Sequence, residues 1–213
     1  MLDDITSSAT YWQSRYRAGG TSGAGSAGRL LAWKAACING FIAANGVGDV
    51  LDFGCGDGAL AARIRVASYR GTDVAADALA RTAAARDGMA TTRLIPWDAM
   101  DCEKQADLAL SFDVIFHLVE DRGYLLYMRR LLAAARRFIL VYSSNLDRAW
   151  PAPHVRHRRF TEAIPAIDPT WRVAAHVPNP YPYDHNRPDT TSFADLYVLA
   201  RPGEDAALVI PAG

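Results

Sequence analysis

Cysteine is scarce in this 213-residue chain, and neither sign of charge is in excess. The three cysteines, Cys37, Cys55 and Cys102, are far apart and form no C-x-x-C pair, which argues against a disulfide framework or a structural zinc site. Lys plus Arg number 23 and Asp plus Glu number 23, so the formal net charge is zero. A protein that coats a nucleic acid would be expected to carry a basic excess. We therefore expect no nucleic-acid partner, and the cysteine usage favours a reducing, cytoplasmic location.

Long apolar runs and internal repeats are also missing. No stretch approaches the ~18 apolar residues of a membrane span, and Asp3 and Asp4 stand where a signal peptide would place lysines. We therefore expect no membrane association. Hydrophobic residues make up 50% of the chain and charged residues 22%, which is enough to bury a core in a single domain of this length.

Strand-like and helix-like segments alternate from Gly48 onward. This alternation predicts right-handed crossovers and a parallel sheet with helices on both faces. Two further strand-like runs, 171–177 and 192–199, are joined without a helix and predict an antiparallel pair at the sheet edge. The expected strands of the first part are 49–53, 69–74, 91–95, 106–112 and 137–142, and the expected helices are 59–67, 75–87 and 123–135.

The first 45 residues have a different character. A short helix with paired aromatics is expected over 6–16, and a longer helix with several apolar positions over 29–44. Between them, residues 19–28 read GGTSGAGSAG, a composition that excludes a regular element and is typical of a flexible linker.

The sharpest local motif is DFGCGDG at residues 52–58, which follows the first expected strand. Glycines at such a turn allow a ligand to approach the backbone closely. The G-x-G-x-G spacing departs from the G-x-G-x-x-G of dinucleotide-binding chains, and Asp52 would repel a pyrophosphate placed beside it. The same carboxylate could accept hydrogen bonds from an ammonium group. The motif therefore favours a ligand with a zwitterionic end, and an NAD-dependent dehydrogenase is the competing hypothesis.

Two more acidic residues follow the next two expected strands. Asp73 is placed to accept hydrogen bonds from both hydroxyls of a ribose, Val74 offers an apolar face for a base, and Asp98 could accept from an exocyclic amine. A single aspartate at a strand end is more often a turn residue or a helix cap. Three such residues together with the glycine turn favour a nucleoside-bearing ligand.

Four segments, DVLDFGCGDG, GTDV, PWDA and ADLALSFDVIFHLVED, resemble the class I S-adenosylmethionine-dependent methyltransferases over residues 48–145. The resemblance implies S-adenosylmethionine as the cofactor and an α/β, Rossmann-like seven-stranded sheet, mostly parallel with one antiparallel strand near the edge. It also implies the cofactor contacts: Asp52, Gly54 and Gly56 beside the methionine moiety, Asp73 on the ribose, Val74 and Asp98 around the adenine, and Phe112 close by.

The flanking segments YWQSRYRAGGTSGAGSAGR, HVRHRRF and NPYPYD are similar to those of small bacterial sugar O-methyltransferases of polysaccharide biosynthesis. That resemblance implies a saccharide acceptor, with a mannoside precursor as one candidate. It also implies that residues 19–28 are part of a lid over the cofactor and not a flexible linker. Trp12 and Arg15 would then contact the cofactor, Arg15 by pairing with its carboxylate. The chain divides accordingly into a lid (1–45), a cofactor-binding core (46–145), acceptor-side loops with the closing strands (146–201) and a tail (202–213).

Methyl transfer to a hydroxyl requires a group that takes the hydroxyl proton. His117 is the natural proton acceptor. If the segment is helical, Asp113, four residues earlier, shares a face with it and could orient it or stabilise its charge. His154, Arg156 and His157 form a second cluster that could orient acceptor hydroxyls, and either histidine could instead be the base. The structural alternatives are a packed histidine at 117 and a solvated basic loop at 154–159.

Several points stay open from the sequence. Tyr181 and Tyr183 could form a stacking wall for a sugar ring or merely a rigid connection. Asp113, His117 and Glu120 offer ligands for magnesium, but no spacing specifies a metal site. A monomer and a homodimer are both compatible with the sequence. The alternatives for function are a methyltransferase for a non-sugar small molecule and a non-catalytic cofactor-binding regulator, while zero net charge disfavours an RNA methyltransferase.

Overall fold

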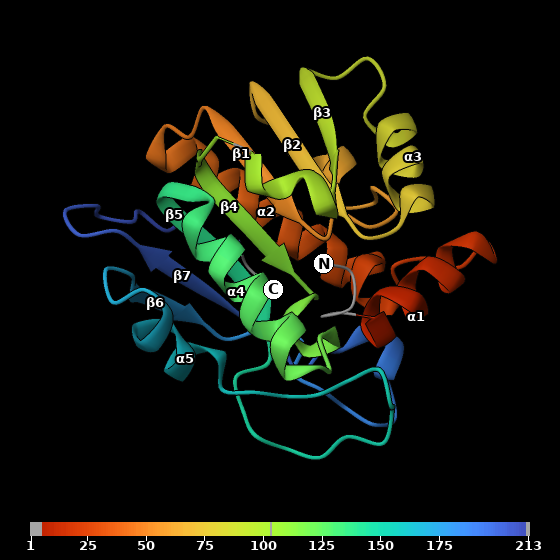
Figure 1. Ribbon diagram of the computed structural model, residues 1–213. Helices are drawn as coiled ribbons and strands as arrows, with labels where there is room; N and C mark the ends of the chain where they lie inside the picture. Colours follow the sequence, from red (N-terminus) through yellow and green to blue (C-terminus); the bar gives the residue numbers. More distant parts are fainter. Residues whose placement is uncertain (1–5, 103, 212–213) are drawn as a thin grey trace.

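A seven-stranded sheet forms the centre of the molecule, whose computed structural model describes residues 6–102 and 104–211 (Figure 1). Its strand order is β3-β2-β1-β4-β5-β7-β6, and β7 runs antiparallel to both of its neighbours, whereas the other pairs are parallel. The predicted fold class is therefore confirmed. The strands are β1 (Asp49–Phe53), β2 (Ser68–Asp73), β3 (Thr91–Pro96), β4 (Ala106–Phe112), β5 (Ala135–Ser143), β6 (Arg172–Val177) and β7 (Asp195–Ala200).

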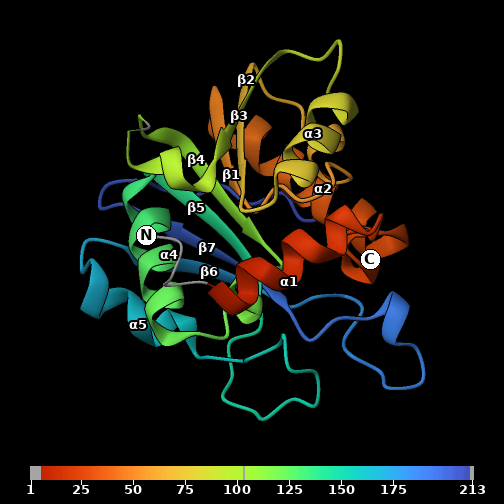
Figure 2. The same ribbon diagram turned by 45° about the vertical axis from the view of Figure 1, so that its right-hand side comes forward.

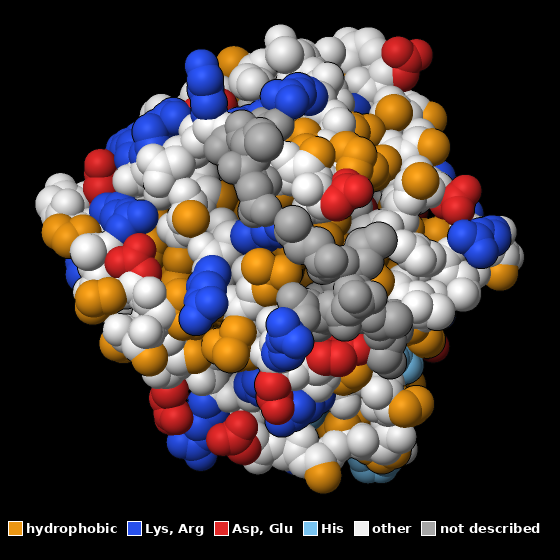
Figure 3. Space-filling model, viewed as in Figure 1, with side chains coloured by type: hydrophobic (Ala, Val, Ile, Leu, Met, Phe, Trp, Pro, Cys, Tyr) orange, Lys and Arg blue, Asp and Glu red, His pale blue; other side chains and the backbone are white. Residues whose placement is uncertain are grey.

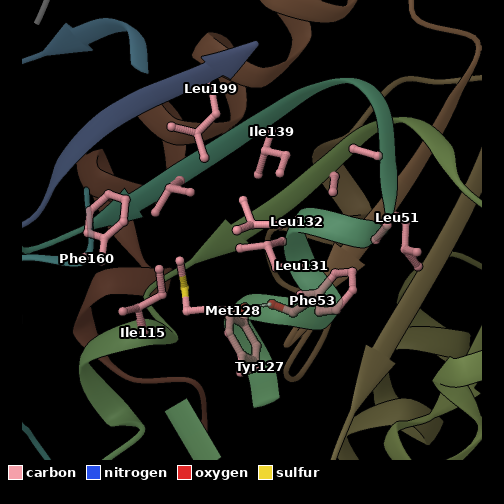
Figure 4. Close-up of a cluster of buried hydrophobic side chains, with 14 of the residues drawn as sticks. Leu51, Phe53, Ile115, Tyr127, Met128, Leu131, Leu132, Ile139, Phe160 and Leu199 are labelled. Carbon is pink, nitrogen blue, oxygen red and sulfur yellow. Dashed lines mark hydrogen bonds between the residues drawn. The ribbon is translucent and has the colours of Figure 1, made fainter. Parts of the chain in front are cut away.

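Helices cover both faces of this sheet, with α4 in front of it and α2 behind it in Figure 1. Alternate residues of each strand belong to two separate hydrophobic cores, because successive side chains of a strand point to opposite faces of the sheet. Leu51 and Ile139 pack with α4 and α5, as Figure 4 shows, whereas Leu108 and Leu140 pack with α2. The helices are α1 (Thr6–Arg17), α2 (Gly28–Asn45), α3 (Ala76–Ala85), α4 (Asp121–Ala133) and α5 (Phe160–Ile167).

The register brings the carboxyl ends of three strands to one edge. Phe53 of β1 pairs with Thr72 of β2 on one side and with Ser111 of β4 on the other. The strand order reverses between β1 and β4, and in open α/β sheets ligands bind in the crevice at such a reversal. The residues that follow these strands are therefore brought together by the topology.

Two sequence-based expectations about helices are wrong. Residues 59–67 were expected to be helical but contain only a 3₁₀ turn, η3 (Ala61–Arg63). Buried Arg86 donates to the carbonyls of Ala61 (2.5 Å) and Ile64 (3.2 Å), which satisfies two acceptors that a longer helix would use. Helix α5 lies in a stretch that was expected to be irregular. Its buried residues Phe160 and Ile164 have helical spacing, but Pro165 masks the pattern.

The surface shows no field of a single charge. On the face viewed in Figure 3, basic and acidic side chains are interspersed, as a formal net charge of zero leads one to expect. No helix in the described part of the chain is long and apolar enough to cross a membrane.

Candidate active site

Two adjoining cavities lie at the edge where β1, β2 and β4 end. The first, called the inner cavity, encloses about 960 Å³ including its opening and is lined by Asp52 and Asp73 at the strand ends. The second, called the outer cavity, measures about 740 Å³ on the same basis. Trp12, Asp113 and His117 line both, so the two spaces meet at these side chains.

The glycine turn makes room for neighbouring protein segments. Gly54 and Gly56 have φ values of +81° and +60°, a region that favours glycine. A Cβ at Gly54 would lie 2.5 Å from Cγ2 of Val114, and one at Gly56 would lie 2.5 Å from Oγ of Ser22. Both glycines are therefore required by close packing. Gly54 lines the inner cavity, and the backbone N–H of Gly56 donates to Oδ2 of Asp73 (3.0 Å).

The two carboxylates of the inner cavity are deeply buried, Asp52 being 2% exposed and Asp73 9%. Burial raises the pKa of each to about 6. Hydrogen bonds oppose this effect: the Tyr69 hydroxyl donates to Oδ2 of Asp52 (2.7 Å), and the N–H of Ala75 donates to Oδ1 of Asp73 (3.0 Å). At neutral pH both groups can present negative charge and acceptor lone pairs to a ligand.

Residues 8–26, which we call the cover, fold over the inner cavity. Figure 2 shows α1 crossing in front of the ends of the strands. The backbone N–H of Ser22 donates to Asp57 (2.8 Å), and Ser22 Oγ accepts from the N–H of Asp57 (3.1 Å). Arg81 donates to the carbonyls of Tyr16 and Gly20, each at 2.6 Å. The glycine-rich stretch is thus fastened to the core by specific hydrogen bonds, unlike a free linker.

Seven aromatic or imidazole side chains are among the residues that line the outer cavity. The ring of His154 stacks on Tyr11 at 4.4 Å and on His117 at 5.5 Å between centroids. Phe116, Tyr183 and Phe193 also line this cavity, and its charged lining residues are Asp113 and Arg15. A ring-shaped acceptor with polar substituents matches this lining.

His117 is held in one tautomer at the junction of the cavities. Its Nδ1 lies 2.9 Å from the carbonyl oxygen of His154, and because a carbonyl only accepts, Nδ1 must carry the proton. Nε2 is then an unprotonated acceptor. Burial, as the largest cause, lowers the pKa of His117 to about 4. The imidazole is therefore neutral at pH 7 and able to accept a proton.

Asp113 makes no hydrogen bond to His117, but its negative charge opposes the lowering of the His117 pKa, in line with the predicted charge stabilisation. Its Oδ2 forms an ion pair with the ammonium of Lys34, which is 1% exposed on α2. Asp113 adopts φ 59°, so the chain turns instead of continuing as a helix. Lys34 was missed by the sequence reasoning, although its spacing from Leu30 and Ile38 places it on the buried face of its helix.

The other predicted cofactor residues are divided between the cavities. Trp12, Val74 and Phe112 line the inner cavity. Arg15 lines the outer one, donates to the carbonyl of Thr21 (2.6 Å) and lies over the Trp12 ring. Asp98 is exposed and outside both linings, whereas its neighbour Trp97 faces the inner cavity.

Two of the five predicted acceptor-binding residues, His154 and Tyr183, line the outer cavity. Arg156 is exposed, donates to the carbonyl of Val119 and pairs with Asp121. His157 is buried behind Phe193, with Nδ1 bonded to Ser144 Oγ (2.8 Å). Tyr181 packs under Arg29, 4.2 Å from the guanidinium carbon to the ring centre. Arg156, His157 and Tyr181 therefore lie outside both cavity linings.

The residues considered for magnesium are used otherwise. Asp113 pairs with Lys34, and Glu120 accepts from the backbone N–H (2.9 Å) and hydroxyl (2.6 Å) of Ser8. Over residues 6–102 and 104–211, no group of three His, Cys, Asp or Glu side chains could hold a metal ion.

Comparison with known proteins identifies the central segment. Residues 51–136 match the family model described as "Methyltransferase domain", whereas no curated protein matches the chain. The match covers the central part of the chain, and the prediction of a methyltransferase is confirmed. The matched residues span the glycine turn, both buried carboxylates and His117.

Several solved structures share the fold over most of the chain. Magnesium protoporphyrin IX methyltransferase (ChlM) from Synechocystis PCC 6803, with bound SAM, has a TM-score of 0.67 and 16% identity, covering 94% of this chain and 98% of its own. The N-methyltransferase NodS from Bradyrhizobium japonicum WM9, in complex with S-adenosylhomocysteine, has a TM-score of 0.65 and 10% identity, covering 92% and 98%. The mitomycin 7-O-methyltransferase MmcR has a TM-score of 0.57 and 17% identity, covering 81% and 54%. At these identities the likeness establishes the fold alone.

Proposed function

We propose that this chain transfers a methyl group from S-adenosylmethionine to a hydroxyl of a small saccharide. One observation carries the proposal: an inner cavity with two buried carboxylates opens, past a neutral histidine, into an outer cavity lined by aromatic rings. The first space suits a zwitterionic nucleoside and the second a ring-shaped acceptor. His117 and Asp113 stand where the two would meet.

The inner cavity fits the chemistry of the cofactor. Asp52 can accept from the ammonium of its amino-acid end, and Asp73 from its ribose hydroxyls. Val74, Trp97 and Phe112 supply an apolar and aromatic lining for the base. Aromatic faces also attract a positively charged sulfonium. When bound there, S-adenosylmethionine supplies an electrophilic methyl group.

The residues of this chain would align the acceptor and take its proton. Nε2 of His117 accepts the hydroxyl proton, while the bond from Nδ1 to the His154 carbonyl keeps the ring in the required tautomer. The negative charge of Asp113 favours the imidazolium that forms. Lys34 holds Asp113 on Oδ2, and the other carboxylate oxygen can accept from an acceptor hydroxyl.

A saccharide is supported by the mixture of rings and acceptors in the outer cavity. Tyr11, Tyr183 and Phe193 offer ring faces against which the apolar face of a sugar can pack, and Asp113 offers hydrogen bonding to hydroxyls. The resemblance of the flanking segments points the same way. The strongly aromatic lining also favours a second candidate, a phenolic natural product.

A methyl-transfer screen separates the two acceptor classes. The protein and radiolabelled S-adenosylmethionine are incubated with mannosides, other glycans and phenols, each with and without EDTA. Comparison of the samples with and without EDTA shows whether methyl transfer requires a metal ion. We expect a methylated glycan, and methylation confined to phenols would contradict the saccharide proposal.

Replacing Asp73 with asparagine should weaken cofactor binding. Asparagine keeps the shape of the side chain but loses the charge that strengthens hydrogen bonds to the ribose. Its NH2 group also replaces one of the two oxygens that accept from the N–H groups of Gly56 and Ala75. Hydrogen bonds to a charged group contribute about 1.5–3 kcal/mol, so we expect a loss of affinity for S-adenosylhomocysteine of roughly 10-fold or more. Calorimetric titration measures it, with exposed Asp77→Asn as the matched control. Unchanged affinity in Asp73→Asn would remove Asp73 from the cofactor site.

The rate at saturating cofactor should be insensitive to pH between 6 and 8. Burial lowers the pKa of His117 to about 4, so the base is already unprotonated at pH 6. A histidine with an ordinary pKa of about 6.5 would make kcat rise roughly fourfold over this range. A rise of that size, measured with the acceptor found in the screen, would contradict His117 as the base.

A further inference from the structure

Three buried side chains form a row behind the glycine turn. Asp52 ends in the inner cavity, Tyr69 of β2 donates its hydroxyl to Oδ2 of Asp52 at 2.7 Å, and the Arg86 guanidinium carbon lies 4.0 Å from the centre of the Tyr69 ring. None of the three is more than 2% exposed. The row therefore links a carboxylate that lines the inner cavity to a positive charge that lies outside this lining.

Arg86 carries its charge without an acidic partner among the described residues. Its Nη1 donates to the carbonyls of Ala61 and Ile64, and its Nε to the hydroxyl of Thr92 (3.0 Å), while Nη2 is buried with no hydrogen-bond partner. A cation over an aromatic face is attracted by the ring and polarises it. Through Tyr69, the positive charge strengthens the hydroxyl as a donor to Asp52.

The groups around Asp52 act in opposite directions. Burial raises its pKa to about 6, and Asp73 at the end of β2 adds to this effect, whereas Tyr69 and Arg86 lower it. The negative charge of Asp52 in turn raises the pKa of the buried Cys55 thiol and of the Tyr127 hydroxyl. Asp52 is thus close to the pH range in which it would lose its charge.

We propose that Tyr69 and Arg86 are positioning residues that keep Asp52 ionised for the ammonium group of the cofactor, and so set the lowest pH at which the amino-acid end is bound. This inference rests on the proposed function. An ionised Asp52 attracts the ammonium and accepts its hydrogen bonds, whereas a protonated one loses the charge. Binding of an ammonium-bearing ligand therefore falls as the pH falls through the pKa of Asp52.

The variant Tyr69→Phe tests this with two ligands. S-adenosylhomocysteine carries the amino-acid end, whereas 5′-methylthioadenosine keeps the adenosine and lacks the ammonium. Without the Tyr69 hydroxyl, we expect affinity for S-adenosylhomocysteine within about twofold of wild type at pH 8 but roughly fivefold weaker at pH 6, as the loss of one charge-assisted bond predicts. Affinity for 5′-methylthioadenosine, measured by calorimetry at both pH values, should match wild type.

Control variants separate positioning from a structural role. Tyr124→Phe removes the hydroxyl of another buried tyrosine, which lies outside both cavity linings. It should change the affinity for neither ligand. In an Asp52→Asn background, Tyr69→Phe should have no further effect. Equal weakening of both ligands by Tyr69→Phe, or weakening independent of pH, would overturn the proposal. If wild type binds 5′-methylthioadenosine but not S-adenosylhomocysteine, Asp52 does not bind an ammonium and the inference fails; binding of neither contradicts the proposed function itself.

If Tyr69→Phe does not fold, two substitutions at Arg86 test the same proposal. Arg86→Gln removes the charge and Arg86→Lys retains it, while both lose the forked hydrogen bonds to the backbone. We expect Arg86→Gln alone to show the pH-dependent loss of S-adenosylhomocysteine affinity. Identical behaviour of the two variants would show that the charge is not what matters.

Discussion

Replacing His117 with alanine should lower the methyl-transfer rate by at least about 100-fold while affinity for S-adenosylhomocysteine changes little. Positioned proton acceptors contribute roughly 10²–10⁴-fold to such reactions. Nε2 of His117 is the unprotonated nitrogen at the junction of the two cavities, and the ring makes no hydrogen bond to either buried carboxylate of the inner cavity. The rate is measured at saturating cofactor with the acceptor identified by the screen.

The matched control is His176→Ala, which removes an exposed histidine on β6. We expect its rate to equal that of wild type. An unchanged rate in His117→Ala would move the base to His154, which stacks on His117 and lines the outer cavity. His157 would not replace it, because it lies outside both linings.

Replacing Lys34 with methionine should destabilise the fold by about 3 kcal/mol, because removing one partner of a buried ion pair strands the other charge. Lys34 is 1% exposed and Asp113 18%, so little water is available to compensate the carboxylate. The Lys34 ammonium also lies 4.9 Å from the centre of the Tyr142 ring and loses that contact. Urea denaturation followed by circular dichroism measures the change in the free energy of unfolding.

A double variant shows whether the ion pair is the cause. Asp113→Asn in the Lys34→Met background removes the stranded charge and should recover part of the lost stability. Lys104 is the only other lysine of the chain, and it is exposed. The free energy of unfolding of Lys104→Met should therefore stay within about 0.5 kcal/mol of wild type. A loss below about 1 kcal/mol in Lys34→Met would contradict a tightly buried pair.

The alternation of strands and helices and the position of the inner cavity could be predicted because their signals are local. The glycine turn after β1, and an acidic residue at the end of both β1 and β2, lie within a few residues of the structure they specify. Parallel pairing then places Asp52 and Asp73 at the same edge. Only the type of ligand needed a chemical argument, from the acidic residue two positions before the first glycine.

The partners of His117 and Asp113 could not be predicted, because they come from distant parts of the chain. Lys34 is 79 positions from Asp113, and the His154 carbonyl is 37 positions from His117. Four-residue spacing predicted a shared helical face for Asp113 and His117, but the positive φ of Asp113 excludes it. A lysine in an amphipathic helix is usually exposed, and only the tertiary structure shows that this one is buried.

The division between inner and outer cavity likewise depends on how loops pack. Arg15 belongs to the cover and was expected on the cofactor side, yet it lines the outer cavity. Asp98 follows β3, whose end lies at the sheet edge beyond β2, and Trp97 takes the position facing the inner cavity. Sequence spacing identifies strand ends but not which side chain of a turn points inward.

Calorimetric titration of the wild-type protein with S-adenosylhomocysteine and, separately, with NADH tests the central claim most directly. The two buried carboxylates of the inner cavity favour the ammonium and ribose of the first ligand and repel the pyrophosphate of the second. We predict saturable binding of S-adenosylhomocysteine with a stoichiometry near one per chain and no binding of NADH. Binding of NADH without binding of S-adenosylhomocysteine would contradict the account.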